Sequence, residues 1–316
     1  MKGIAMQIRR LTTLLLASLT IAATATPAVA DTDPIATSAD LPADAFYSDR
    51  ITVRTVGTGP DVVLIPGLSS SPAVWESTIA AFPGYRYHLV QVRGFAGLEP
   101  GANANGPVVA PVAKEIARYV EDLKLEQPAL IGHSMGGALA MMIAARHPEL
   151  PGKVMVVDMM PFMGAMFAPN ATPEIVAPIA AQIRDGIATS PAETREAMTK
   201  QTIAGMVKTE ELRAGPLADS LASDPGVSGQ AMYELITTDL RPELTDITVP
   251  LAVLWAMPEG APITKDQMAE FYRLSYALAP LATITNVPDS SHFIMFDAPD
   301  EFRKILDGFL AEVVER

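Results

Sequence analysis

Short apolar runs, each bounded by turn residues, alternate along the chain with longer segments of helical periodicity. Residues 61–65 (DVVLI) end at Pro66-Gly67, and residues 129–132 (ALIG) lead directly into a largely apolar segment over 135–147. A buried parallel strand is apolar throughout, whereas an amphipathic helix repeats about every 3.6 residues. The predicted strands cover residues 51–56, 61–65, 87–92, 129–132, 154–158, 251–255 and 282–287.

Helices are predicted between these strands, over residues 74–82, 111–124 and 135–147 and from about residue 298. In the second of them, Val112, Ile116 and Val120 lie on one face, which is the pattern of an amphipathic helix. Strands that alternate with helices predict an α/β fold, with a mostly parallel, doubly wound sheet and flanking helices.

Residues 161–246 interrupt this alternation, with helical patches, prolines and glycines but no convincing strand. Because they lie between two predicted strands, we interpret them as a helical cap inserted into a core of residues 46–160 and 247–316. The start of the cap is rich in flexible apolar side chains, which suit an irregular pocket wall, although ordinary packing on the core is the alternative. The pocket is assigned to four residues: Met160, Phe162, Met163 and Phe293.

The first thirty residues have the pattern of a secretory signal peptide. Lys2, Arg9 and Arg10 precede an uncharged, mostly apolar run over 11–23, and Ala28-Val29-Ala30 matches a cleavage site. The run is short for a transmembrane anchor, the rival interpretation. We therefore expect residues 1–30 to be removed, residues 31–45 to form a flexible leader, and the protein to be exported to a bacterial periplasm or secreted, without a stable membrane anchor.

Composition restricts the partners and the chemistry. The 316 residues carry a formal net charge of −13, so we expect no nucleic-acid partner. The chain contains no cysteine, which excludes disulfides, thiolate catalysis and cysteine-based metal sites. Its four histidines are far apart in the sequence and form no close pair. We expect neither a metal site nor another cofactor.

The candidate chemistry concentrates at Gly132-His133-Ser134-Met135-Gly136, a G-x-S-x-G pattern between a predicted strand and a predicted helix. In that context, a sharp turn exposes the serine hydroxyl above the edge of the sheet, and the two glycines let the turn close. The backbone N–H of Met135 and the positive end of the helix would then face an oxyanion that forms beside Ser134.

With these residues the chain resembles the α/β-hydrolase fold superfamily, in its serine esterase and lipase branch. The resemblance covers roughly residues 50–315 and includes segments 132–137, 65–68 and 291–293. It implies that the N–H of Leu68 is the second oxyanion donor. The family usually has histidine where this chain has Pro66, but a backbone donor does not need that side chain.

Ser134 needs a base, and four histidines compete for this role. His292 follows the last predicted strand, in a loop that opens at the same edge of a parallel sheet as the Ser134 loop. Its position also fits the superfamily order of serine, acid and histidine. We therefore assign the base to His292, and we assign His88, His133 and His147 to structural roles.

The acid that orients the base has two candidates. The superfamily usually places it after the strand before the last one, and Glu259 follows strand 251–255 at the matching spacing, with glutamate where aspartate is usual. Some members place it after the strand that follows the nucleophile helix, where this chain has Asp158. The sequence favours Glu259 and keeps Asp158 as the alternative.

These assignments predict an exported serine hydrolase that cleaves small to medium apolar carboxylic esters through an acyl-enzyme on Ser134. A peptidase or amidase, a cofactor-free haloperoxidase and a C–C hydrolase would use the same triad, and a non-catalytic ligand receptor would share the scaffold. A peptidase that recognises a free amino terminus would need an acidic cluster in the cap. The candidates for such a cluster are Glu193, Glu196, Glu210 and Glu211. Their pattern is typical of solvated helix faces.

Overall fold

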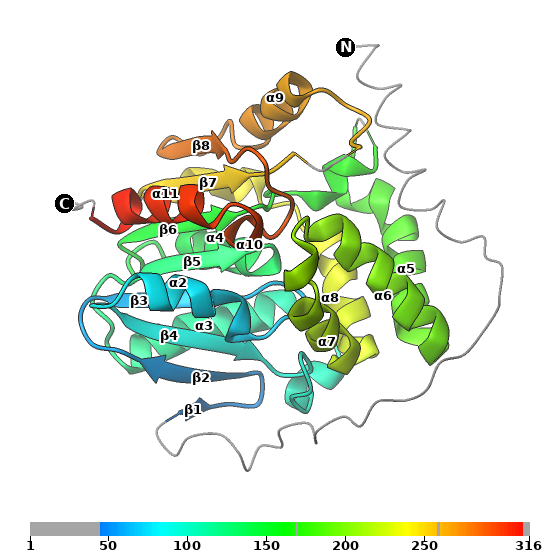
Figure 1. Ribbon diagram of the computed structural model, residues 1–316, viewed down its shortest axis with the longest axis horizontal. Helices are drawn as coiled ribbons and strands as arrows, with labels where there is room; N and C mark the ends of the chain where they lie inside the picture. The colour runs from blue at the N-terminus through cyan, green and yellow to red at the C-terminus, as the bar shows by residue number, and fades with distance from the viewer. Residues whose placement is uncertain (1–44, 169, 258–259, 312–316) are drawn as a thin grey trace.

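The computed structural model describes residues 45–168, 170–257 and 260–311. The predicted signal peptide and nearly all of the predicted leader lie outside these ranges. The described chain is built on an eight-stranded sheet with the order β1-β2-β4-β3-β5-β6-β7-β8 (Figure 1). Its strands are β1 Phe46–Tyr47, β2 Ile51–Val56, β3 Asp61–Ile65, β4 Arg86–Val92, β5 Ala129–His133, β6 Lys153–Val157, β7 Leu251–Trp255 and β8 Ala282–Asn286.

The strands from β3 to β8 pair in parallel, while β1 and β2 form an antiparallel edge. Strand β3 shows why the centre of the sheet is apolar on both faces. Val63 and Ile65 belong to one apolar cluster, whereas Val62 and Leu64 belong to another on the opposite face. Each buried side chain of this kind stabilises the fold by about 1.5–3 kcal/mol.

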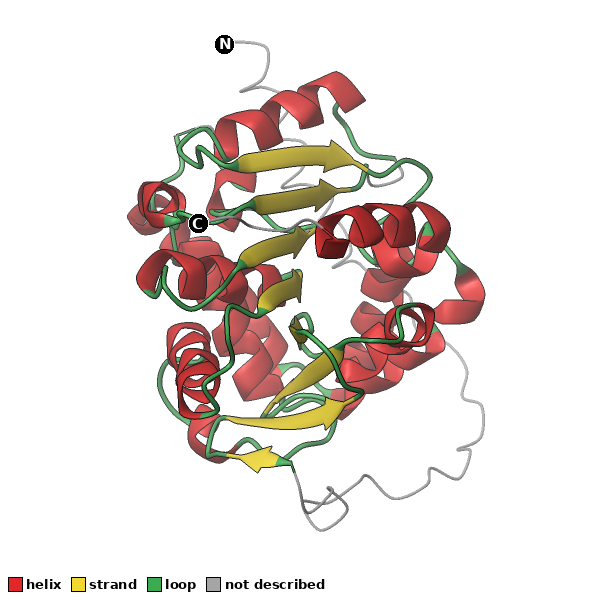
Figure 2. Cartoon of the chain, turned by 90° about the vertical axis from the view of Figure 1, so that its left-hand side faces the viewer, coloured by secondary structure: helices red, strands yellow, loops and turns green. Residues whose placement is uncertain are grey.

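Helices cover both faces of this sheet, as Figure 2 shows. The predicted α/β class with a mostly parallel, doubly wound sheet is therefore confirmed. Two helices of the core, α9 and the four-residue α10, were not predicted from the apolar pattern; within α9 only Met268 and Tyr272 are buried. One face carries α3 Val109–Asp122, α4 Met135–Arg146 and α9 Lys265–Ser275, and the other carries α2 Glu76–Ala81, α10 Ile294–Asp297 and α11 Pro299–Ala311.

Four further helices lie between β6 and β7 in the sequence, at the carboxyl ends of the parallel strands (Figure 1). We refer to them as the cap helices. Helices α5 and α8 share a small apolar cluster that includes Phe162, Val176 and Ile236. Their bounds are α5 Pro173–Thr189, α6 Ala192–Met206, α7 Ala214–Ala222 and α8 Pro225–Thr237.

The junction between α7 and α8 is tied to the loop after β4. The N–H of Asp224 donates to Gly94 O at 2.7 Å, and the N–H of Gly97 donates to Ala222 O at 3.1 Å. Gly94 has a φ of 93°, and a Cβ there would meet the Val227 side chain at 2.8 Å. Only glycine suits this backbone conformation and this close approach.

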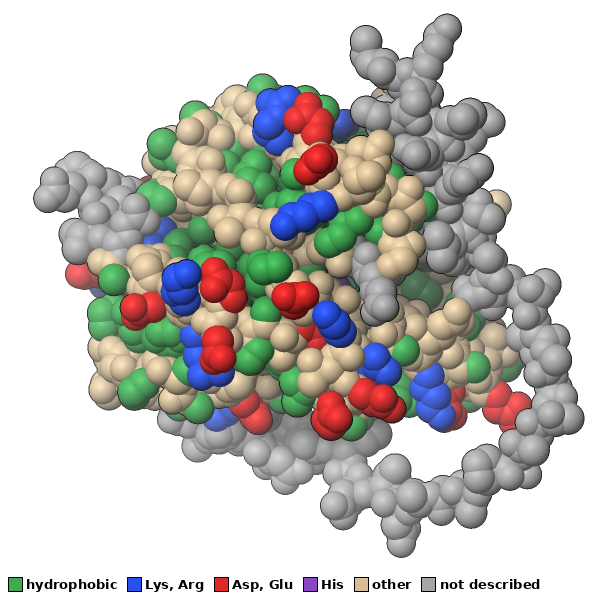
Figure 3. Space-filling view, turned by 45° about the horizontal axis from the view of Figure 1, so that its top comes forward, with side chains coloured by type: hydrophobic (Ala, Val, Ile, Leu, Met, Phe, Trp, Pro, Cys, Tyr) green, Lys and Arg blue, Asp and Glu red, His purple; other side chains and the backbone are tan. Residues whose placement is uncertain are grey.

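On the outer surface, acidic and basic side chains are interspersed over the face that Figure 3 shows. None of the helices in the described ranges has the length and apolar character needed to cross a bilayer.

Cap helix α8 also completes a helix of the core. Val108, at the start of α3, has no side-chain cap of its own. Instead, the Glu234 carboxylate of α8 accepts from the N–H groups of Val108 at 2.9 Å and Val109 at 2.7 Å. A carboxylate at this position satisfies N–H groups that have no partner within the helix and opposes the positive end of its dipole.

Replacement of this capping carboxylate should destabilise the whole fold. Glu234→Ala is expected to lower the free energy of unfolding by about 1–2 kcal/mol, because it leaves two N–H groups of α3 without an acceptor. Urea unfolding would measure the change. Glu196→Ala is the matched control, since Glu196 is an exposed carboxylate of the cap helices that pairs with Lys200 on its own helix. Equal effects of the two substitutions would contradict the capping role.

Candidate active site

Ser134 occupies a sharp turn between β5 and α4. Its backbone has a φ of 53° and a ψ of −121°, and its N–H donates to Val157 O at 2.9 Å. A Cβ on Gly132 would collide with Gly136 O, and one on Gly136 would collide with Ile65 O. These two glycines therefore allow the first turn of α4 to lie against β5 and the end of β3. The result is a half-buried serine at the carboxyl edge of the sheet.

His292 reaches the same edge from the loop between β8 and α10. Its Nδ1 lies 2.7 Å from Oδ2 of Asp158, the residue that follows β6. The sequence favoured Glu259 as this partner, but the structure makes the contact with Asp158, and Glu259 lies outside the described residues. Asp158 turns toward the histidine because its backbone adopts a φ of 53° while its N–H donates to Leu254 O at 2.8 Å.

The ring of His133 connects the serine turn to the histidine loop. Its Nε2 lies 3.0 Å from His292 O, and its ring centroid lies 4.6 Å from that of His292. A carbonyl oxygen only accepts, so Nε2 must carry the proton. Because Ser134 directly follows His133, this contact brings the serine and His292 into one site. Ser134 is half-buried, and its Oγ makes no hydrogen bond to any described residue.

His133 itself is fully buried, and burial holds the pKa of its imidazole well below the usual value of 6.5. The nearby His292 ring acts in the same direction. The side chain therefore stays neutral near pH 7, with Nδ1 unprotonated. This Nδ1 has no hydrogen-bond partner within the described part of the chain, and it faces Gly67.

The loop after β3 supplies the second side of the site. A Cβ on Gly67 would lie 3.2 Å from Cβ of Ser134, so Leu68 follows directly beside the serine. Among the described residues, the N–H groups of Leu68 and Met135 have no hydrogen-bond acceptor. Two unpaired donors beside a serine hydroxyl have the character of an oxyanion hole.

Cap helices hold this loop from the other side. Ser71 donates to the Asp219 carboxylate of α7 from its N–H at 2.8 Å and from its hydroxyl at 2.6 Å. The hydroxyl of Ser69 lies 2.8 Å from that of Ser228 in α8. Burial raises the pKa of Asp219, while the Ser71 donors act against this rise. The serine-rich sequence of the loop gave no indication of these contacts.

The four residues assigned to a pocket have different surroundings. Met160 and Met163 are half-buried and pack against the main apolar cluster. Phe162 is 1% exposed within the cluster of the cap helices, and Arg241 lies 4.7 Å above its ring. Phe293 is buried against His133, with ring centroids 4.6 Å apart. The two methionines are therefore the members of this set with exposed surface.

The other histidines lie in different parts of the molecule. Buried His88 lies 2.6 Å from the Tyr119 hydroxyl and 2.7 Å from Asp61, in a polar network beside β3 and β4. His147 follows α4. One nitrogen of its ring lies within 4.8 Å of a carboxylate oxygen of Glu121 and of one of Glu149. These three groups are close enough together to contact a cation, but both carboxylates are exposed. The cluster lies at the opposite end of α4 from Ser134 and is separate from the candidate active site.

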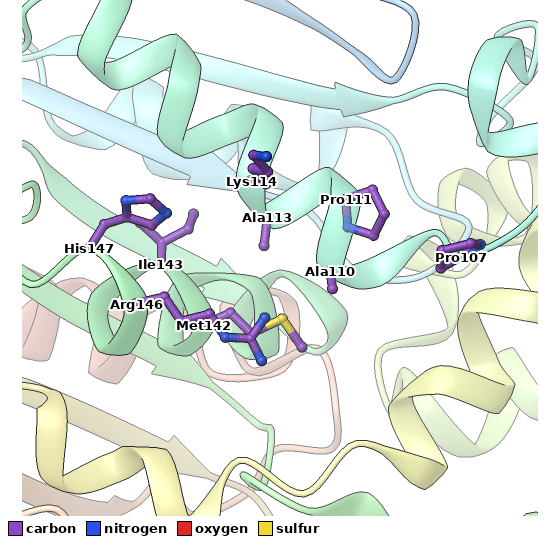
Figure 4. A pocket seen from close by; sticks show the side chains of 9 residues that line it. All are labelled: Pro107, Ala110, Pro111, Ala113, Lys114, Met142, Ile143, Arg146 and His147. Carbon is purple, nitrogen blue, oxygen red and sulfur yellow. The ribbon is translucent and has the colours of Figure 1, made fainter.

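A hollow of about 550 Å³ lies between α3 and α4 (Figure 4). Apolar side chains such as Pro107, Met142 and Ile143 line it together with Lys114 and Arg146. Arg146 is already paired with Glu243 at 2.7 Å. Neither Ser134 nor His292 lines this hollow, so it is separate from the candidate active site.

The fold and this arrangement define a class of protein, and the comparison with known families agrees. Residues 62–305 match the model of the Alpha/beta hydrolase family. The chain belongs to this family and is an alpha/beta hydrolase.

The individual relatives share only a modest part of their sequence with this chain. The chain is 27% identical, over 274 residues, to the pimeloyl–acyl-carrier protein methyl ester esterase of Aeromonas hydrophila, and this match covers 82% of the chain and 99% of the esterase. The enol-lactonase of Burkholderia xenovorans superposes with a TM-score of 0.65 at 21% identity, covering 83% of this chain and 96% of that one. An esterase from Exiguobacterium antarcticum reaches a TM-score of 0.68 at 21% identity, with the same coverage. These two likenesses show the shared fold.

The neutral state of His133 predicts how stability depends on pH. In the unfolded chain His133 takes up a proton below about pH 6.5, whereas the buried ring of the folded protein does not. The stabilisation that the neutral ring contributes is therefore present above that pH and is lost as the pH falls. Replacement by glutamine keeps a donor for His292 O and removes the titration. Urea unfolding at about pH 7.5 and about pH 5 should therefore show a smaller loss of stability on acidification for His133→Gln than for wild type.

Gln201→Ala, which removes an exposed neutral side chain of α6, is the control for this experiment. Because it changes no titratable group, its loss of stability on acidification should equal that of wild type. A His133→Gln variant that also loses as much stability as wild type would show that the ring is not held neutral.

Proposed function

We propose that the protein is a serine hydrolase of carboxylic esters, with Ser134 as nucleophile, His292 as base and Asp158 as the acid that orients the base. The observation that carries this proposal is the 2.7 Å contact between His292 Nδ1 and Asp158, at the sheet edge where Ser134 occupies its strained turn. Asp158 thereby takes the role for which the sequence favoured Glu259. A carboxylate in this position holds the imidazole tautomer and stabilises the imidazolium that forms during the reaction.

The protonation states follow from this contact. A proton on Nδ1 that is donated to Asp158 leaves Nε2 with a free lone pair. Nε2 takes the proton of Ser134 as Oγ bonds to the ester carbonyl carbon, and the carbonyl oxygen becomes an oxyanion that the N–H groups of Leu68 and Met135 stabilise. Collapse of this intermediate breaks the bond to the alcohol oxygen, and the alcohol leaves with the proton from His292. A water molecule activated by Nε2 then hydrolyses the acyl-enzyme, releasing the carboxylic acid and free Ser134.

The substrate class that we propose is a small to medium apolar ester. Its support is the half-buried apolar surface of Met160 and Met163, beside the start of the cap helices. The relative from Aeromonas hydrophila is a methyl ester esterase by its name, which supports a carboxylic ester as the substrate. The four cap carboxylates that a peptidase would need, Glu193, Glu196, Glu210 and Glu211, are all exposed, which favours an ester over a peptide.

We also propose that the protein is exported, to a bacterial periplasm or to the medium. This proposal rests on the sequence of residues 1–30, with its positive start, apolar run and Ala28-Val29-Ala30 site.

Substitution of the three side chains separates their roles. Ser134→Ala should abolish both fluorophosphonate labelling and the hydrolysis of nitrophenyl esters, because the attacking oxygen is gone. Asp158→Asn should lower kcat by about 10⁴-fold, because the amide favours the wrong tautomer of His292. Glu259→Gln is the matched control and should retain the activity of wild type.

Circular dichroism would establish that each variant is folded. Loss of turnover in Glu259→Gln, together with near-normal turnover in Asp158→Asn, would reverse the assignment of the acid. A wild-type protein that neither reacts with the probe nor hydrolyses any ester of a chain-length series would contradict the esterase proposal.

A further inference from the structure

The carboxylate of Asp158 has a second set of contacts on the oxygen that faces away from His292. Its Oδ1 accepts from the Ala256 N–H at 3.0 Å and from the Tyr272 hydroxyl at 3.2 Å. Its Oδ2 meets His292 Nδ1 at 2.7 Å. The two carboxylate oxygens are therefore committed to different partners, and the plane of the group is fixed by three donors from three segments of the chain.

Tyr272 is held rigidly in this position. Its side chain is 3% exposed, and its ring stacks on Trp255 with centroids 5.3 Å apart and an interplanar angle of 18°. Helix α9 itself begins with a reciprocal pair of hydrogen bonds between Thr264 and Gln267. Because the ring is packed on both the helix and the strand side, the direction of the hydroxyl is set before any substrate binds.

From these contacts we infer that Tyr272 is a positioning residue for the acid of the site: it fixes the Asp158 carboxylate and takes up part of its negative charge. This inference rests on the proposed function of Ser134, His292 and Asp158. It adds Tyr272 to the set of site residues, a residue that the G-x-S-x-G pattern does not indicate. A phenol that donates to one oxygen reduces the charge that the other oxygen presents to His292.

Few other titratable groups face this carboxylate from the elements packed around it. His133, on β5, lies beside the His292 ring with centroids 4.6 Å apart, and burial keeps its pKa low and the ring neutral. Tyr276 follows α9 and is buried like Tyr272, but its hydroxyl donates to Met159 O at 2.7 Å. Burial beside Asp158 raises the pKa of both tyrosines well above the usual value, so both remain protonated donors. Within the described ranges, Tyr272 is the titratable side chain that donates to Oδ1.

The consequence concerns the pH at which His292 loses its proton. Removal of the Tyr272 hydroxyl leaves more of the carboxylate charge to stabilise the imidazolium of His292. The ring then holds its proton to a higher pH, and the enzyme needs a higher pH to have its base free. The acidic limb of the kcat/KM profile should move upward accordingly.

The test compares Tyr272→Phe with Tyr276→Phe. Each variant loses one buried hydroxyl from the same region of the fold, but only the first loses a donor to Asp158. The primary measurement is the NMR titration of the His292 ring, assigned by its loss in His292→Ala. In Tyr272→Phe the midpoint should rise by about half a pH unit or more, and in Tyr276→Phe it should stay at the wild-type value.

The acidic limb of nitrophenyl ester hydrolysis should shift by the same amount in Tyr272→Phe. Incorporation of 3-fluorotyrosine at position 272 is a second change, which preserves the packing and makes the hydroxyl a stronger donor, so the midpoint should fall. The fluorotyrosine protein also tests the role of Tyr272 if the Tyr272→Phe variant does not fold.

A Tyr272→Phe midpoint that equals that of Tyr276→Phe, or one that falls, would overturn the inference, as would an unchanged midpoint with fluorotyrosine. The NMR titration needs no substrate. A protein that fails to react with fluorophosphonate would therefore contradict the proposed function separately, while the titration would still decide the role of Tyr272.

Discussion

The close approach of three backbone segments at Gly132 and Gly136 is the constraint on which the site depends. Strand β5, the first turn of α4 and the end of β3 meet there, at distances that leave no room for a Cβ on either glycine. This contact forces Ser134 into a positive φ and directs it away from the sheet. It also brings the loop of Gly67 and Leu68 beside the serine, so that the Ser134 side chain and the two unpaired backbone N–H groups are positioned by the same packing.

The other half of the site depends on loops that follow parallel strands. Asp158 and His292 are 134 positions apart, yet β6 and β8 end at the same edge as β5 and flank β7 between them. Contacts from Ala256 and Tyr272 then orient the carboxylate, and the buried ring of His133 holds the carbonyl of His292. The cap helices contribute through Asp219 and Ser228, which anchor the loop that carries Leu68. The site is thus supported by core elements and by the cap helices.

Much of this could be predicted from the sequence. Alternation of apolar runs and amphipathic segments predicted the sheet, and the pattern around Ser134 predicted the turn, since both depend on local features. The carboxylate partner of His292 could not be decided in this way, because Asp158 and Glu259 both follow strands that end at the same edge. The choice depends on the φ of Asp158 and on donors from the residue after β7 and from α9, which are tertiary features. Tyr272 was missed because a tyrosine in a mostly polar segment resembles ordinary helix packing.

The most direct test of the account is a crystal structure of the protein after reaction with a fluorophosphonate. The account predicts a covalent phosphonyl group on Ser134 Oγ, with its free oxygen within hydrogen-bond distance of the N–H groups of Leu68 and Met135 and with His292 between Ser134 and Asp158. A phosphonyl oxygen directed away from both N–H groups, or an adduct on another residue, would contradict it.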